Sequence, residues 1–141
     1  MPICYGGGVK TINDFKRLFS LGVEKVSVSS LLFEDLSIIH EAVNMFGSQS
    51  IIATIDVRSN WWRKFIGVYK HNGKIPIKQP LQQVLETIGQ SKVGELIVNN
   101  IDREGTWEGF DIDLMGKITD ALDIPVVSLG GGGNLGHISE V

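Results

Sequence analysis

The sequence predicts an α/β fold built on a parallel β-sheet, and three observations carry this prediction. Short apolar runs alternate with longer segments of helical period along the 141 residues. The runs are rich in valine and isoleucine and lack strict polar alternation, which is typical of strands buried on both faces. A glycine precedes several of these runs, as at Gly22, Gly47 and Gly94. This repeated order indicates βα units joined by helical crossovers.

Five apolar runs are predicted strands, and the segments between them are predicted helices. The predicted strands are Pro2–Tyr5, Lys25–Ser29, Ile51–Val57, Glu95–Ile101 and Pro125–Leu129. The predicted helices are Thr11–Ser20, Glu34–Phe46, Pro80–Gln90, Ile112–Leu122 and a last one after Asn134. In the first helix, Thr11 and Asp14 have the spacing of a capping box.

The segment 58–79 is longer than an ordinary connection between a strand and a helix. Within it, Phe65–Tyr69 and Lys74–Ile77 flank an Asn-Gly pair, which is a strong signal for a β-hairpin. The chain is therefore predicted to be one domain, residues 1–141, with an inserted β-hairpin at about 58–79. Trp61 and Trp62 are expected to pack on this hairpin or to form a lid.

Two architectures fit five consecutive βα units. One is an open, doubly wound sheet, and the other is part of a (β/α)₈ barrel. A complete barrel takes about 200 residues or more. A barrel would therefore be present only in part in this chain.

Composition excludes several classes of protein. The net charge of −3, with no basic run, does not favour nucleic-acid binding. No apolar stretch approaches the ~18 residues that a membrane span needs, and no charged leader is visible. The single cysteine, Cys4, fits a reducing compartment and is expected to be buried and unreactive. The three histidines have no metal-ligand spacing. A cytoplasmic protein without a metal or cofactor is expected.

Two glycine clusters follow predicted strands, Gly6–Gly8 near the start and Gly130–Gly133 near the end. Glycine lets the backbone turn tightly and approach a ligand, and bare N–H groups beside a helix N-terminus suit phosphate. The two clusters predict a ligand with two anionic ends. The alternative is a pair of tight turns with no ligand.

Polar residues gather where the predicted strands end. Asp56 ends a strongly apolar strand, so its carboxylate is a candidate general acid or base, or else a partner of Arg58. Ser29 and Ser30 could bind a ligand or cap the next segment. The segment Asp102–Thr106 could hold an anion or form a solvated loop. At the opposite ends of two strands, Lys25 and Glu95 could pair as a stabilising rim.

Seven motifs occur in an order that resembles one known family, the cyclase subunit of imidazole glycerol phosphate synthase. They are Gly6–Gly8, Lys25–Ser30, Phe46–Gln49, Thr54–Asp56, Asn100–Thr106, Gly109–Asp111 and Leu129–Gly132. The segments Met1–Gly8 and Ser20–Lys25 are closer to a divergent branch of the family. That branch is associated with amidino sugars of surface polysaccharides.

The resemblance implies a (β/α)₈ barrel of which this chain holds strands three to seven. It implies a lyase reaction in which ammonia from a glutaminase partner attacks a ribulosyl-aminoimidazole carboxamide nucleotide with two phosphates. The products would be imidazole glycerol phosphate and an aminoimidazole carboxamide nucleotide. No cofactor, nucleic acid or membrane is implied.

The resemblance also assigns roles to individual residues. Asp56 matches the catalytic aspartate of the fifth barrel strand. Three groups of binding residues follow: Gly8, Ser29 and Ser30 in the first phosphate site, Glu104, Gly105 and Gly131 in the second, and Asn99 as a substrate contact. Lys25 and Glu95 match a charged gate through which ammonia enters.

Three residues depart from the usual pattern of the family. Ser29 stands where asparagine is usual, Glu104 where aspartate is usual and Asn99 where threonine is usual. The departures leave three hypotheses: the histidine-pathway cyclase, an ammonia-using subunit of amidino-sugar synthesis, and a phosphate-binding half-barrel without activity. The second catalytic aspartate of the family belongs to the first strand, so this chain alone is expected to be inactive.

Overall fold

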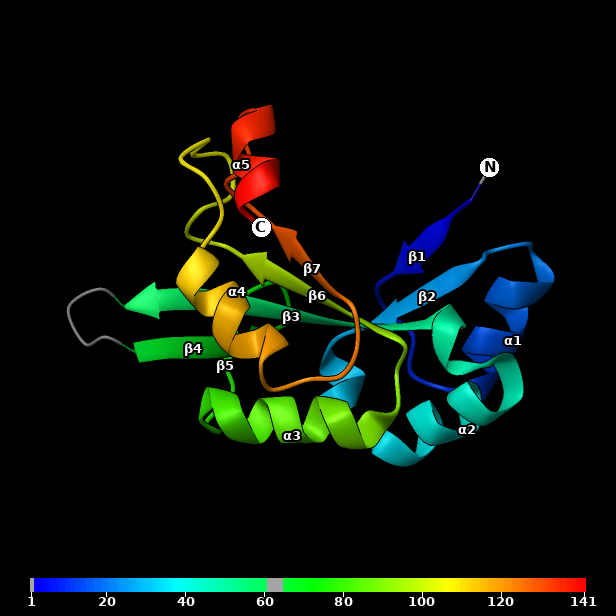
Figure 1. The fold of residues 1–141 in the computed structure, drawn as a ribbon. Helices are drawn as coiled ribbons and strands as arrows, with labels where there is room; N and C mark the ends of the chain where they lie inside the picture. The colour runs from blue at the N-terminus through cyan, green and yellow to red at the C-terminus, as the bar shows by residue number, and fades with distance from the viewer. Residues whose placement is uncertain (1, 61–64) are drawn as a thin grey trace.

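Five parallel strands lie side by side in the order in which they follow one another along the chain. The computed structural model describes residues 2–60 and 65–141. The strands are β1 (Cys4–Gly6), β2 (Lys25–Val28), β3 (Ile51–Asn60), β6 (Glu95–Asn100) and β7 (Val126–Leu129). The pairs β1–β2, β2–β3, β3–β6 and β6–β7 are all parallel (Figure 1).

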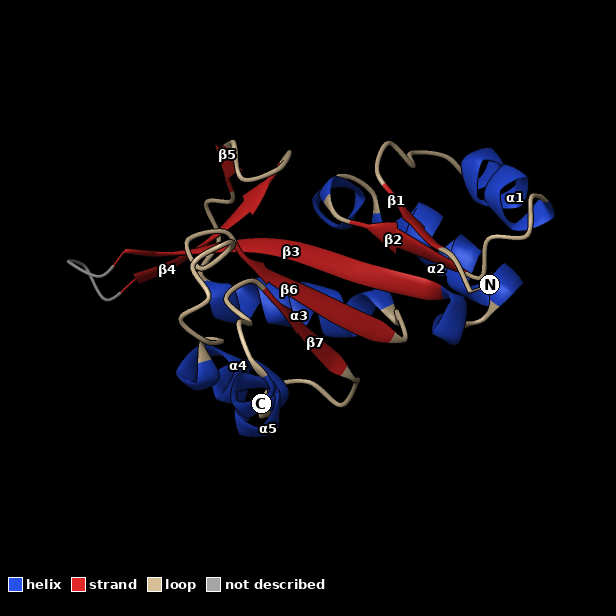
Figure 2. Cartoon of the chain, turned by 90° about the horizontal axis from the view of Figure 1, so that it is seen from above, coloured by secondary structure: helices blue, strands red, loops and turns tan. Residues whose placement is uncertain are grey.

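This order decides between the two architectures. A doubly wound sheet reverses its strand order at a switch point, whereas a barrel adds each new strand beside the previous one. The observed sheet has no reversal, and α2 and α3 lie beneath it in Figure 1 and behind its strands in Figure 2. The prediction of an α/β fold with part of a (β/α) barrel is therefore confirmed.

The helices begin and end close to the predicted residues. They are α1 (Ile12–Ser20), α2 (Leu36–Phe46), α3 (Leu81–Ser91), α4 (Ile112–Thr119) and α5 (Leu135–Glu140), with short 3₁₀ helices η1 (Ser30–Phe33) and η2 (Ser48–Ser50). The capping box of α1 is confirmed: the Thr11 hydroxyl accepts from the Asp14 N–H, and the Asp14 carboxylate accepts from the Thr11 N–H. The backbone N–H groups of Lys10 and Thr11 both donate to the Asp14 carboxylate and hold the pKa of Asp14 below its usual value.

The helix expected from Glu34 begins later, because η1 comes first. The Asp35 carboxylate then accepts a hydrogen bond from the Ser37 N–H at 2.9 Å and caps α2. The fourth predicted helix is also shorter than expected, since α4 ends at Thr119 rather than at Leu122.

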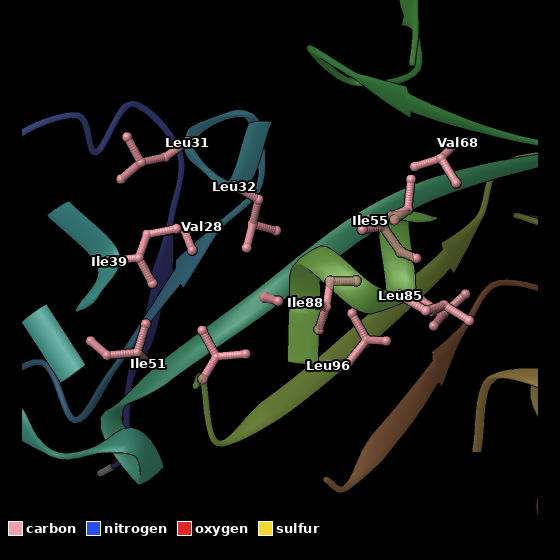
Figure 3. Packing of buried hydrophobic residues seen from close by; sticks show 14 of the residues in the cluster. Val28, Leu31, Leu32, Ile39, Ile51, Ile55, Val68, Leu85, Ile88 and Leu96 are labelled. Atoms are coloured by element: carbon pink, nitrogen blue, oxygen red, sulfur yellow. The ribbon is translucent and has the colours of Figure 1, made fainter. Parts of the chain in front are cut away.

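The side of the sheet that faces the helices holds the hydrophobic core. In β6, Leu96 and Val98 are buried on this side, while Ile97 and Asn99 on the other side are partly exposed. Figure 3 shows Ile39 of α2 beside Val28, and Ile88 of α3 between Ile55 and Leu96. All of these core side chains are at most 3% exposed. We call the opposite side of the sheet the inner face.

The strand β3 is longer than predicted and changes partner along its length. It continues past Val57 to Asn60 and pairs in antiparallel fashion with β4 (Phe65–Lys70). The strand β5 (Ile75–Pro76) then pairs with β4. Between β4 and β5, His71, Asn72 and Gly73 all have left-handed φ angles of 56°, 56° and 73°. Trp61 and Trp62 lie outside the described residues.

The two outermost strands leave the sheet open. Val127 and Leu129 of β7, which lie on the inner face, are 40% and 49% exposed.

Within the described residues, no helix has the length and apolar character needed to cross a membrane.

Gly94 predicts a test of the packing between the loops that precede β3 and β6. A Cβ at Gly94 would lie 2.5 Å from the backbone oxygen of Ser48, so Gly94→Ala forces the two loops apart. Overpacking of this kind costs about 1–3 kcal/mol. We expect the free energy of unfolding in urea to fall by that amount.

Gly116→Ala is the matched control. Gly116 lies within α4, with no atom within 4 Å of the added Cβ, so we expect it to stabilise the protein by about 0.5–1 kcal/mol. Equal effects of the two substitutions would contradict this account.

Candidate functional site

A pocket opens where β3 changes its neighbour on one side. The pairing of β2 with β3 ends at Ala53, and the pairing of β4 with β3 begins at Asp56. Between these points β2 turns away into η1, which leaves a gap at the carboxyl end of the strands. The gap forms a cavity of about 400 Å³. In parallel α/β sheets, ligands bind in such crevices outside the carboxyl ends of the strands.

The pocket brings together four of the residues predicted from the sequence. Asp56 lies in its wall and is 8% exposed. Gly8, Ser29 and Ser30 line the same cavity. Ser29 is the N-cap of η1 but makes no side-chain capping bond, so its hydroxyl is not used as a cap.

The first glycine cluster has an open backbone. Gly7 and Gly8 have φ angles of 111° and 72°, which a residue with a Cβ rarely adopts. No atom lies within 4 Å of the place where a Cβ would stand at either residue. The backbone at this turn is therefore reachable by a ligand.

The second glycine cluster is packed against another loop. A Cβ at Gly130 would stand 2.6 Å from the Asn100 carbonyl oxygen, and one at Gly131 would collide with the Gly109 carbonyl. The Gly109 N–H also donates to the Gly131 carbonyl at 2.8 Å. At Gly130 and Gly131, glycine is thus required by the close approach of the loops before α4 and α5.

Glu104 and Gly131 lie at this loop contact, Gly105 follows Glu104 along the chain, and none of the three lines the pocket. Gly105 has a φ of 73° with open space around it, whereas Gly131 is buried. Arg103 donates to the Gly109 carbonyl at 3.0 Å. The predicted second phosphate site is therefore spatially separate from the pocket.

Three polar pairs cross the inner face at successive levels. Lys25 and Glu95 pair at the amino ends of β2 and β6. Above them, the hydroxyls of Ser27 and Thr54 lie 2.6 Å apart. At the carboxyl ends, the Asn99 amide nitrogen donates to an Asp56 carboxylate oxygen at 2.8 Å.

The lowest pair agrees with the expectation that Lys25 and Glu95 meet. The hydrogen bond with Glu95 raises the pKa of Lys25 above its usual value. Cys4, however, is exposed on β1, so the expectation that it is buried was wrong. Its place on an edge strand explains the difference. Partial desolvation raises the pKa of the Cys4 thiol, opposed by the nearby Lys25.

The pocket residues that sequence reasoning missed include the polar side chains of Lys10, Glu34, His71 and Asn72. His71 and Asn72 line the pocket because β4 pairs antiparallel with β3 and leads the chain back to the site. Glu34 lies 3.6 Å from the Lys70 ammonium and 4.0 Å from the His71 ring nitrogen. In the sequence, only the length of the insertion indicated that it could reach the site. The register of β4 on β3 is needed to show that the turn lies over the pocket.

The chemistry of the pocket follows from these groups. Open backbone and two hydroxyls can receive a phosphate at one end, and a buried carboxylate can move a proton near them. The described residues contain no group of three or more His, Cys, Asp or Glu side chains placed to hold a metal ion.

These features define a barrel-type (β/α) protein with a ligand pocket at the carboxyl ends of its strands. The family model described as histidine biosynthesis protein matches residues 1–141, and the chain belongs to this family. It is 38% identical over 141 residues to a Pseudomonas aeruginosa protein provisionally named imidazole glycerol phosphate synthase subunit hisF2.

Further relatives carry the HisF name. The chain is 34% identical over 141 residues to the imidazole glycerol phosphate synthase subunit HisF of Leptospira biflexa and 33% identical to that of Lactococcus lactis. All of the chain is covered in these matches, but only 56%, 55% and 54% of the three relatives. The chain thus spans a little over half the length of the curated relatives that it matches.

The pairing of Lys25 with Glu95 predicts a pH dependence. The pKa of Lys25 is higher in the folded chain than its ordinary value of 10.5, so the pair stabilises the fold below that pH. The contribution is lost as the pH rises through the folded value. We expect urea unfolding between about pH 10 and 12 to show a steeper loss of stability for the wild type than for Lys25→Met.

The Lys16→Met variant serves as a control, because Lys16 is an exposed lysine of α1 without an ion pair in the described part of the chain. Parallel curves for the wild type and Lys25→Met would contradict the predicted coupling.

Proposed function

We propose that this chain supplies the general base and residues of both phosphate sites of an ammonia-using cyclase of the imidazole glycerol phosphate synthase type. The observation that carries the proposal is the pocket, in which the buried Asp56 carboxylate lies beside an open glycine turn and two serines. The names of the relatives support the same reaction class.

In this proposal, a bisphosphorylated ribulosyl-aminoimidazole carboxamide nucleotide places one phosphate at Gly8, Ser29 and Ser30. Asp56 removes a proton during attack by ammonia and ring closure. The second phosphate lies near Glu104, Gly105 and Gly131. Ammonia from a glutaminase subunit enters past Lys25 and Glu95, at the other end of the inner face.

Ring closure and release of imidazole glycerol phosphate need both an acid and a base. In this proposal Asp56 acts as the catalytic aspartate of the fifth barrel strand, and the partner aspartate belongs to the first barrel strand. Turnover is therefore expected in a barrel that contains both strands.

A second candidate is amidino-sugar synthesis on the same scaffold. It is favoured by Ser29, Asn99 and Glu104, which differ from the residues usual in the histidine-pathway cyclase. A phosphate-binding role without catalysis is the third. The scaffold and pocket are the same in all three, so the substrate distinguishes them.

The open glycine turn predicts phosphate binding. We expect inorganic phosphate at millimolar concentration to raise the melting temperature of the chain, because a ligand that binds only the folded state stabilises it. Gly8→Ala should lose most of this increase, since a Cβ there strains a backbone with a φ of 72°.

Gly22→Ala is the matched control for backbone strain. Gly22 has a φ of 86° and open space around it, but lies outside the pocket. It should lower the starting melting temperature and keep the increase with phosphate. An equal increase in all three proteins would show that the turn is not an anion site.

A turnover assay tests the cyclase proposal. The chain is mixed with separately produced fragments of the Pseudomonas aeruginosa relative that cover the parts outside the match, and then given ammonia and the ribulosyl nucleotide. We expect imidazole glycerol phosphate to form, and Asp56→Asn to slow its formation by at least about 100-fold.

Asp123→Asn, at an exposed position, is the control for loss of a carboxylate. No product from the wild-type mixture would contradict the histidine-pathway reaction. Full activity of Asp56→Asn would remove Asp56 from the mechanism.

A further inference from the structure

We propose that Asn99 is a positioning residue, whose side-chain amide fixes the orientation of the Asp56 carboxylate instead of contacting the substrate. The inference rests on the proposed role of Asp56 as general base. It replaces the substrate contact that the family resemblance implies for this position.

Strand register places the two side chains next to each other. Asp56 and Asn99 are direct partners in the parallel pairing of β3 with β6, which runs without a break over 52–57 and 95–100. Both side chains therefore leave the sheet on the inner face, from strands that lie about 4.8 Å apart. The amide nitrogen of Asn99 reaches the Oδ1 atom of Asp56 at 2.8 Å.

The chemistry of the pair fixes the orientation of the amide. An ionised carboxylate only accepts hydrogen bonds, so Asn99 must present its N–H₂ group to Asp56 and turn its carbonyl oxygen elsewhere. One carboxylate oxygen is then held by Asn99, while Asp56 also lines the pocket. A base held at one oxygen can keep the other aimed at the proton that it removes.

The Asn99 amide is a neutral donor, so it adds no positive charge beside the Asp56 carboxylate. Arg58, which was the alternative partner of Asp56, lies over the Tyr69 ring, 5.5 Å from its centroid. Asn99 can therefore orient the Asp56 carboxylate without placing a charged partner on it.

The bond to Asp56 uses one of the two hydrogens of the Asn99 amide. Asn99 does not line the pocket that Asp56 lines, so its amide is placed to hold the carboxylate and not a ligand in that pocket. Loss of Asn99 should therefore reduce the rate of the chemical step more than substrate binding.

The first test measures, by NMR of the free chain, whether the Asn99 amide is hydrogen-bonded to Asp56. In the wild type we expect a side-chain amide proton of Asn99 to exchange with solvent at least about tenfold more slowly than those of Asn44, which is exposed on α2. Asp56→Ala should abolish the protection. Equal exchange of Asn99 and Asn44 in the wild type would overturn the proposal.

The second test uses the same turnover assay with the fragments of the relative. Asn99→Leu keeps the size of the side chain without the donor, and Asn99→Ser is a smaller polar variant in case the first does not fold. We expect kcat to fall roughly 10- to 100-fold, with KM changed less than about twofold. Asn44→Leu should change neither.

The two tests distinguish failure of the cyclase proposal from failure of the positioning role of Asn99. A rise in KM at constant kcat would show that Asn99 contacts substrate and would overturn the positioning role. If the wild-type mixture gives no product, the proposed function fails, and slow exchange of the Asn99 amide still establishes the contact with Asp56.

Discussion

The parallel pairing of β3 with β6 is the constraint on which both the core and the site depend. It joins six consecutive residues of each strand. On the helix side it places Ile55 and Val57 beside Val98 and Asn100, and on the inner face it places Asp56 beside Asn99. Side chains alternate along a strand, so a shift by one residue would turn Asp56 toward the helices and apolar side chains toward the pocket. The burial of Ile55 and Val57, each 0% exposed, opposes such a shift and thereby fixes the position of the acid.

The two glycine clusters look alike in sequence and differ in structure. At Gly7 and Gly8 the space beside the backbone is empty, so glycine serves a conformation that other residues avoid. Gly130 and Gly131 also have positive φ angles, of 96° and 99°, but there a neighbouring carbonyl occupies that space, so glycine serves the packing of two loops as well. The first cluster gives a ligand access to the backbone, whereas the second joins the ends of β6 and β7.

Local signals predicted much of the fold, and long-range pairing limited the rest. The capping box at Thr11 involves residues three apart, so the sequence shows both partners directly. The continuation of β3 to Asn60 depends on β4, and apolar periodicity does not show that partner. For the same reason the sequence indicated Asp56, Ser29 and Ser30 as candidates but not the pocket wall from His71 and Asn72. The packing at Gly131 was equally hidden, because its neighbour Gly109 is 22 residues earlier in the chain.

The inserted hairpin carries residues of the pocket on a turn that lies outside the hydrophobic core. Its first strand, β4, pairs with β3, its second strand, β5, pairs with β4, and Val68 of β4 is buried in the core. Its turn ends in His71 and Asn72, which line the pocket but are not part of the core. New side chains at the turn can therefore reshape the pocket while the strand that carries Asp56 keeps its register. A scaffold arranged in this way can acquire a new substrate through a few changes at one hairpin turn.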